Sequence, residues 1–116
     1  MNRRQVFGAG LIGILFAAPG IPATGNAEEP ATIEVTLKNH QFSPAEIHVP
    51  TGKPVILRIT NQDDTVEEFD SIALQVEKVI VGGHYALVRL RPLGPGRFPF
   101  MGEYHAETAK GVVISE

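Results

Sequence analysis

Most of the chain alternates apolar and polar residues with a period of two. The alternation is clearest over residues 32–38, where Ile33, Val35 and Leu37 are separated by polar side chains. Such a pattern indicates a strand with one buried face. The run at residues 55–59 is almost continuously apolar, which is typical of a central strand.

Further short apolar or alternating segments follow at intervals of about 8–12 residues, the spacing of an all-β sandwich or barrel. They are predicted at residues 46–49, 66–71, 72–81, 85–91, 98–101 and 112–114. Proline and glycine clusters at residues 50–54 and 92–96 separate them as turns. No segment combines a helical period with helix caps. The pattern therefore predicts an all-β domain of seven to eight strands.

The first 27 residues differ in character from the rest. Arg3 and Arg4 precede a short apolar run, and small residues stand at Gly25 and Ala27. This layout predicts a signal peptide at residues 1–27, cleaved after Ala27. The apolar run is shorter than the roughly 20 residues that a membrane-spanning helix needs, which argues against an uncleaved anchor.

The arginine pair also resembles a twin-arginine signal, although ordinary signals carry such pairs as well, so both export routes stay open. A single domain is then expected at residues 28–116, exported to the periplasm as a soluble protein. Loss of Arg3 and Arg4 with the signal changes the formal charge from −3 to −5. An acidic domain argues against nucleic acid as a partner, because phosphate binding needs a basic patch.

The composition also excludes several chemistries. The chain has no cysteine, so it has neither a disulfide nor a thiol nucleophile. Its serines lack the sequence context of a nucleophile elbow, and no glycine-rich loop precedes a helix to hold phosphate. No catalytic residue and no organic cofactor is therefore predicted.

Candidate chemistry gathers in three blocks. Residues 39–52 read Asn-His-Gln-Phe-Ser-Pro-Ala-Glu-Ile-His-Val-Pro-Thr-Gly, and Glu67-Glu68-Phe69 follows a polar loop at 61–65. Residues 96–111 form a strand, a short loop with Met101, Glu103 and His105, and the start of the last strand.

These blocks, in this order, resemble the cupredoxin family, whose opening pattern F-x-P-x-x-I-x-V-x-x-G joins the first two strands. The resemblance implies a Greek-key β-sandwich with a metal site at one end. It also implies that Glu67 stands where the family has a ligand histidine. Gly102, three residues before His105, stands at the place of the ligand cysteine. A blue-copper centre needs a thiolate and two imidazoles, so this chain is expected to be unable to build one.

With paired glutamates at the histidine position and glycine at the cysteine position, the chain resembles the small EfeO-type cupredoxin-like proteins of bacterial periplasmic iron-uptake systems. The EfeO domain itself, however, carries cysteines. That likeness implies copper or iron as the bound ion. It also implies a membrane iron permease and other periplasmic uptake proteins as partners.

The candidate metal ligands are Glu67, Glu68, Met101, Glu103 and His105. Carboxylates favour harder ions, a thioether favours Cu(I), and an imidazole suits copper, iron or zinc. Glu67 shares a strand face with Phe69, and a buried carboxylate is costly unless it is paired or bound to metal. The simpler alternatives are a solvated acidic loop, a methionine that fills the core and a histidine without a ligand role. His40, His48 and His84 are expected at the surface, with His40 close to the ligand end.

The sequence thus predicts a periplasmic metal-binding protein that assists iron uptake by metal capture, handover or oxidation. Two alternatives stay open. One is a metal-free sandwich that serves as an interaction module. The other is a ferroxidase, for which a domain of this size leaves little room for a substrate pocket.

Overall fold

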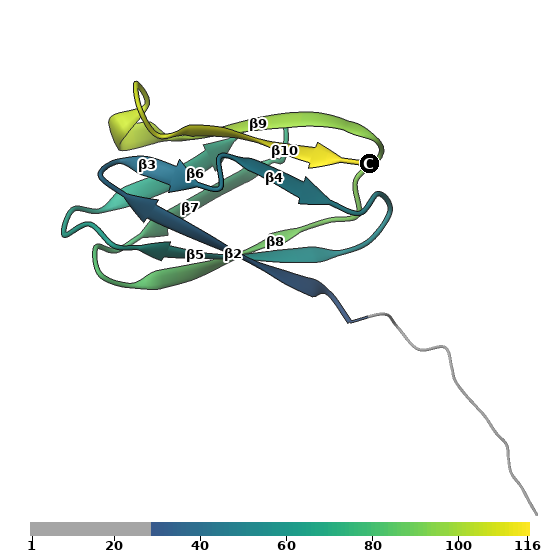
Figure 1. Cartoon of the computed structure of the whole chain (residues 1–116), viewed down its shortest axis with the longest axis horizontal. Helices are drawn as coiled ribbons and strands as arrows, with labels where there is room; N and C mark the ends of the chain where they lie inside the picture. The colour runs from purple at the N-terminus through teal and green to yellow at the C-terminus, as the bar shows by residue number, and fades with distance from the viewer. Residues whose placement is uncertain (1–28) are drawn as a thin grey trace, which may run out of the picture.

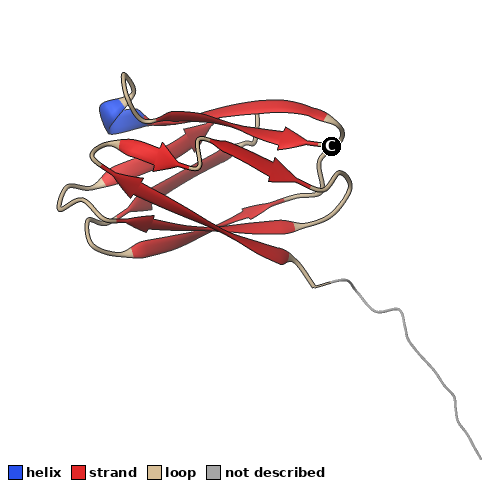
Figure 2. Cartoon of the chain, in the orientation of Figure 1, coloured by secondary structure: helices blue, strands red, loops and turns tan. Residues whose placement is uncertain are grey.

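The structure is a computed structural model that describes residues 29–116, so the predicted signal peptide lies outside the described residues. Two sheets pack face to face as a sandwich, and strands dominate the described part (Figures 1 and 2). The described elements are β2 (Ala31–Lys38), β3 (Gln41–Ser43), β4 (Glu46–Val49), β5 (Val55–Asn61), β6 (Glu67–Ser71), β7 (Val76–Ile80), β8 (Tyr85–Leu90), β9 (Gly96–Gly102), the 3₁₀ turn η2 (Glu103–His105) and β10 (Lys110–Ser115).

The strands form one five-stranded and one four-stranded sheet. The order is β4-β10-β9-β6-β7 in the first and β3-β2-β5-β8 in the second. Both sheets are mixed, because β10 runs parallel to β4 and β2 runs parallel to β5. The central position predicted for residues 55–59 is confirmed, since β5 pairs with β2 on one side and β8 on the other.

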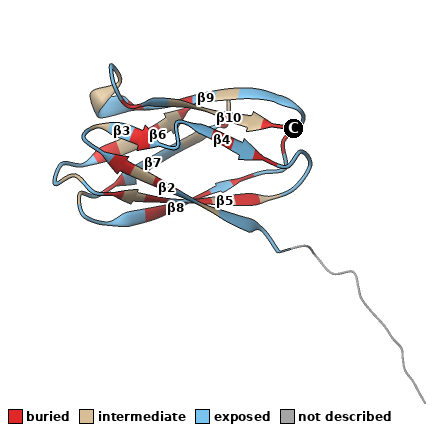
Figure 3. Ribbon diagram, in the orientation of Figure 1, coloured by how far each residue is buried: buried red, intermediate tan, exposed pale blue. Residues whose placement is uncertain are grey.

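The core lies between the sheets and takes alternate residues from each strand (Figure 3). Phe42, Phe69 and Phe100 form an aromatic cluster, with ring centroids 4.8 to 6.0 Å apart. Burying one such side chain stabilises the fold by about 1.5–3 kcal/mol. Phe69 lies on β6 and Phe100 on β9, so this cluster fixes the two strands that lead to the candidate loop.

The all-β prediction is confirmed, and the differences are local. The described residues form nine strands, whereas seven to eight were predicted, because the three-residue β3 is too short to stand out in the sequence. The segment predicted as one strand at 72–81 is a turn followed by β7. Ile72 is 91% exposed in that turn, whereas Leu74 is buried and its backbone N–H donates to Ser71 Oγ. The apolar residues of this turn therefore produced a sequence pattern like that of a strand.

One end of the sandwich gathers the segments that carry the candidate ligands. The β2–β3 turn, the β5–β6 loop and η2 all lie at this end, at the left of Figure 1, away from the C-terminus. Across residues 29–116, no helix has the length and apolar character needed to cross a membrane.

Candidate functional site

Glu67 is a buried carboxylate at the start of β6. Its exposed fraction is 1%, and Phe69, two residues further along the same strand face, is fully buried. Glu68 points to the opposite face and is half-buried. The alternation of the strand therefore separates the two glutamates as the sequence predicts, and only Glu67 enters the end of the sandwich.

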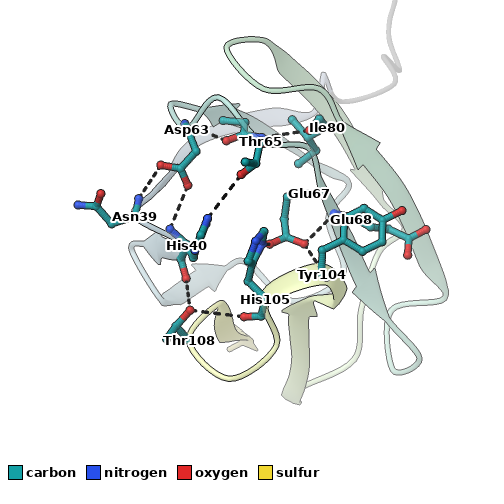
Figure 4. A network of polar contacts seen from close by, with 11 residues as sticks. Asn39, His40, Asp63, Thr65, Glu67, Glu68, Ile80, Tyr104, His105 and Thr108 are labelled. Carbon is teal, nitrogen blue, oxygen red and sulfur yellow. Dashed lines mark hydrogen bonds and ion pairs between the residues drawn. The ribbon is translucent and has the colours of Figure 1, made fainter.

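The Glu67 carboxylate is held by three partners (Figure 4). Oε1 accepts hydrogen bonds from the backbone N–H groups of Glu68 at 2.9 Å and Tyr104 at 2.8 Å. Oε2 lies 2.7 Å from Nδ1 of His105. Burying a charge without partners is costly, and these contacts offset that cost. The predicted proximity of Glu67 and His105 is confirmed, although they come from β6 and from η2.

Gly102 gives the carboxylate its space. A β-carbon on residue 102 would lie 2.6 Å from Cδ of Glu67, 2.7 Å from its Oε2 and 2.9 Å from Cβ of Ala109. Atoms cannot approach so closely, so any side chain at 102 has to displace Glu67. The carboxylate therefore fills the space that a side chain at the expected cysteine position needs.

His40 covers the ring of His105. The two imidazoles stack with centroids 3.5 Å apart and planes 11° from parallel. The sequence indicates a polar Asn39-His40 pair between two strands, which marks a turn, but no local pattern shows which residue the ring will contact. His40 was expected at the surface near the ligand end, and its place beside His105 is the main feature that sequence reasoning underrated.

The backbone of the His40 turn is fixed on both sides. Asn39 and His40 adopt left-handed conformations, with φ of 52° and 58°. The Asp63 carboxylate accepts their N–H groups at 2.7 and 3.0 Å, and Thr108 Oγ1 donates to the His40 carbonyl at 2.7 Å. Partial burial alone raises the pKa of Asp63, but these N–H groups and the nearby imidazoles outweigh it and hold the pKa below its ordinary value.

The two histidines line an open hollow at the end of the sandwich. Its walls are His40, Tyr104, His105, Ala106, Glu107 and Thr108. Nδ1 of His105 is engaged by Glu67, whereas Nε2 has no hydrogen-bond partner among residues 29–116. The side chain of His105 is 26% exposed, so its ring is reachable from solvent.

The remaining predicted ligands lie elsewhere. Glu103 is exposed and meets Asp70 and Glu68. A side-chain hydrogen bond with Asp70 and the negative charges of both neighbours raise the pKa of Glu103 above its ordinary value. Met101 is 39% exposed and lines a second hollow with Ile72, which shares no lining residue with the first.

The described residues do not fit a blue-copper centre. The chain has no thiolate, and the Glu67 carboxylate fills the space at Gly102. The oxygens of Glu67 already face three nitrogen atoms. Within residues 29–116, no three or more histidine, aspartate or glutamate side chains converge in an arrangement ready to hold a metal ion. The metal role of the five predicted ligands stays a prediction.

Comparison with known proteins identifies the fold family. The family model for the cupredoxin-like domain matches residues 11–115. The chain belongs to this family. A relative, an uncharacterized protein of Rickettsia prowazekii, is 38% identical over 82 residues, which cover 71% of this chain and 66% of that protein. The match thus spans just under two thirds of the relative's length.

Solved structures share the cupredoxin-like fold at low identity. The metal binding domain of the Streptococcus pneumoniae Cu(I) exporting P-type ATPase CopA, solved with Cu(I), has a TM-score of 0.64 and 17% identity, over 78% of this chain and 91% of that one. Auracyanin A, a "blue" copper protein of Chloroflexus aurantiacus, has a TM-score of 0.62 and 14% identity, over 76% of this chain and all of the other. These comparisons support the fold, and the likeness to EfeO-type proteins stays a prediction.

Proposed function

We propose that this cupredoxin-like protein is exported to the periplasm, binds a copper or iron ion at the His105 end of the sandwich, and assists iron uptake by capturing and handing over that ion. One observation carries the proposal. A buried carboxylate, Glu67, holds Nδ1 of His105 at 2.7 Å, while the other ring nitrogen has no hydrogen-bond partner among residues 29–116 and lies beside an open hollow.

The donor chemistry favours capture over fast electron transfer. Without a thiolate, the end of the sandwich offers imidazole nitrogen and carboxylate oxygen, which suit copper and iron ions. The hollow is open to solvent, so an ion can enter and leave without a large rearrangement. The solved neighbours named above include a Cu(I)-bound metal binding domain and a "blue" copper protein, so the shared fold is compatible with a metal role.

The biological setting rests on the resemblance to small iron-uptake proteins. On that basis the partners are a membrane iron permease and other periplasmic uptake proteins. The acidic character expected of the mature domain, with a formal charge of −5 after loss of Arg3 and Arg4, adds a weak attraction for cations.

Calorimetric titration of the protein purified from the periplasmic fraction tests the proposal. Cu(I), Cu(II) and Fe(II) are added in turn, with oxygen excluded for Cu(I) and Fe(II). We expect one ion to bind, and His105→Ala to lose at least about tenfold in affinity, the low end for a disrupted site. His48→Ala is the matched control, because His48 lies on β4 and pairs with Glu116 instead. If the parent protein binds none of the ions, the metal-free interaction module becomes the better account.

A further inference from the structure

The hydrogen bonds of Glu67 determine which nitrogen of His105 carries a proton. Oε1 already accepts two backbone N–H groups, and Oε2 faces Nδ1. An ionised carboxylate can only accept hydrogen bonds, so the partner nitrogen has to donate. The neutral imidazole of His105 then has its proton on Nδ1 and a free lone pair on Nε2.

We propose that Glu67 is a positioning residue and not a metal ligand: it fixes the tautomer of His105 so that Nε2 is the metal donor, with the imidazole of His40 as the second nitrogen donor. This inference rests on the proposed function and assigns the ligands of its site. Metal-bound histidines commonly donate their second ring N–H to a carboxylate, which orients the ring and raises its basicity.

Glu67 and His105 differ in burial, and this difference assigns the positioning role to Glu67 and the metal-donor role to His105. Glu67 is 1% exposed and its two oxygens serve three partners, so binding an ion through it breaks at least one of those contacts. Nε2 of His105 belongs to a side chain that is 26% exposed and has no hydrogen bond to lose among the described residues. An ion therefore reaches the imidazole at lower cost than the carboxylate.

His40 is held near His105 without being committed to another partner. Asp63 and Thr108 fix its backbone, and the stacked rings lie 3.5 Å apart. Its Nε2 is 3.5 Å from Thr65 Oγ1, a distance at which a hydrogen bond is weak. The lone pairs of the ring nitrogens lie in nearly parallel planes and do not converge on one point, so one ring has to turn for both to contact one ion. Such a site suits exchangeable binding.

Glu67→Gln tests the proposal with almost no change of shape. The amide oxygen of the substituted side chain has to take the Oε1 position, because two backbone N–H groups point at it. The amide NH₂ then faces Nδ1 as a donor, which moves the ring proton to Nε2 and blocks the metal donor. Glu77→Gln is the control, because Glu77 is an exposed glutamate on β7 that does not line the hollow.

Long-range ¹H–¹⁵N NMR of the metal-free protein reports the tautomer directly. The spectra are recorded at a pH at which the ¹⁵N shifts of the ring themselves show a neutral imidazole. We expect the proton on Nδ1 in the parent and in Glu77→Gln, and on Nε2 in Glu67→Gln. Affinity for Cu(I) should fall about 10–100-fold in Glu67→Gln and stay unchanged in Glu77→Gln.

Two results overturn the inference. One is a proton on Nε2 of His105 in the parent, and this measurement needs neither a variant nor a metal. The other is parent-like Cu(I) affinity in Glu67→Gln after its tautomer has changed.

Should Glu67→Gln fail to fold, Cu(I) added to the parent protein tests which ring nitrogen of His105 binds the ion. The ¹⁵N signal of Nε2 in His105 should move more than that of Nδ1, and the reverse order contradicts the proposal. A parent protein with the proton on Nδ1 that binds no ion instead refutes the proposed function and leaves the role of Glu67 in the tautomer intact.

Discussion

The carboxyl carbon of Glu67 lies 2.6 Å from the point where a β-carbon on residue 102 would stand. The two positions are therefore coupled, since one can hold a large buried side chain only if the other holds none. This relation gives a physical reason for glycine at the place where the family resemblance leads one to expect cysteine. It also means that residue 102 cannot take a side chain unless Glu67 or Ala109 moves.

Gly102→Ala should destabilise the protein by about 1–3 kcal/mol, the usual cost of inserting a methyl group into a closely packed site. The physical reason is that the methyl group has to displace Glu67 or Ala109. Thermal or urea unfolding measures the effect. Gly94→Ala is the control, because nothing lies within 4 Å of a β-carbon built there. Equal stability of the two variants would show that the space at Gly102 is not tight.

Cu(II) should produce no intense visible band in the parent protein. The strong colour of blue copper comes from the copper–thiolate bond, and the chain has no cysteine to form it. Absorption spectroscopy during a Cu(II) titration checks this. An intense band near about 600 nm, the region of thiolate–copper absorption, would contradict the interpretation of Gly102 as the vacated thiolate position.

Asp63→Asn should lower the free energy of unfolding at neutral pH by on the order of 1 kcal/mol. The substitution replaces a charged acceptor of two backbone N–H groups by a neutral amide, and the partial exposure of the site keeps the loss small. The pKa of Asp63 is lower in the folded protein than its ordinary value of 3.8. The unfolded chain therefore takes up the proton first as pH falls. The stabilisation is fully present above about pH 4 and is lost as pH falls through the folded pKa.

Urea unfolding of the parent and Asp63→Asn at about pH 7 and about pH 3 measures this loss. The difference in unfolding free energy between the parent and Asp63→Asn should be smaller at the lower pH. Asp64→Asn is the control, since Asp64 is the exposed neighbour in the same loop. A difference in unfolding free energy that stays constant with pH would mean that the Asp63 charge does not stabilise the turn.

Glu103→Gln should raise the melting temperature at neutral pH. The pKa of Glu103 is raised by its hydrogen bond with Asp70 and by the charges of Asp70 and Glu68. For an acid whose folded pKa is raised, the folded protein binds the proton more readily. The parent therefore loses stability as pH rises above about 4.5, the ordinary pKa of this group.

Melting curves across that interval provide the measurement, with Glu107→Gln as the exposed control on the same loop. The advantage of Glu103→Gln over the parent should shrink as pH falls, because protonation of Glu103 relieves the same repulsion. A lower melting temperature for Glu103→Gln at neutral pH would mean that the carboxylate contributes a favourable contact.

The exported protein should begin near Glu28. The short apolar run and the small residues at Gly25 and Ala27 predict cleavage after Ala27. N-terminal sequencing of protein recovered from the periplasmic fraction decides the point. Recovery of a chain that begins at Met1 in the membrane fraction would favour an anchored protein.

The sequence was sufficient for most of the fold because strand alternation is a local signal. The pattern around Glu67 and Phe69 also predicted the side on which the carboxylate lies, and the resemblance placed it near His105. Alternation predicted the structure less well where chain segments are short or irregular. The three residues of β3 are too few to show a period, and Ile72 is apolar although it lies exposed in a turn.

The partner of His40 could not be inferred in the same way. Its ring meets His105 from a distant part of the chain, and such contacts depend on how loops pack at one end of the sandwich. The two left-handed residues of the turn are held by Asp63, which lies in a third segment. No periodicity encodes these relations. The separation of the Met101 and Glu103 side chains from that of His105 likewise depends on the directions in which β9 and η2 present their side chains.

The double attachment of the His40 backbone limits how this end can evolve or be engineered. Asp63 holds it from the β5–β6 loop and Thr108 from the segment after η2, so three loops form one interlocked unit. Grafting a single loop from a blue-copper relative would break these attachments, and a graft of the η2 loop would also replace Tyr104 and His105, two of the three partners of Glu67. The end is therefore not modular, and its loops can be exchanged only as a set.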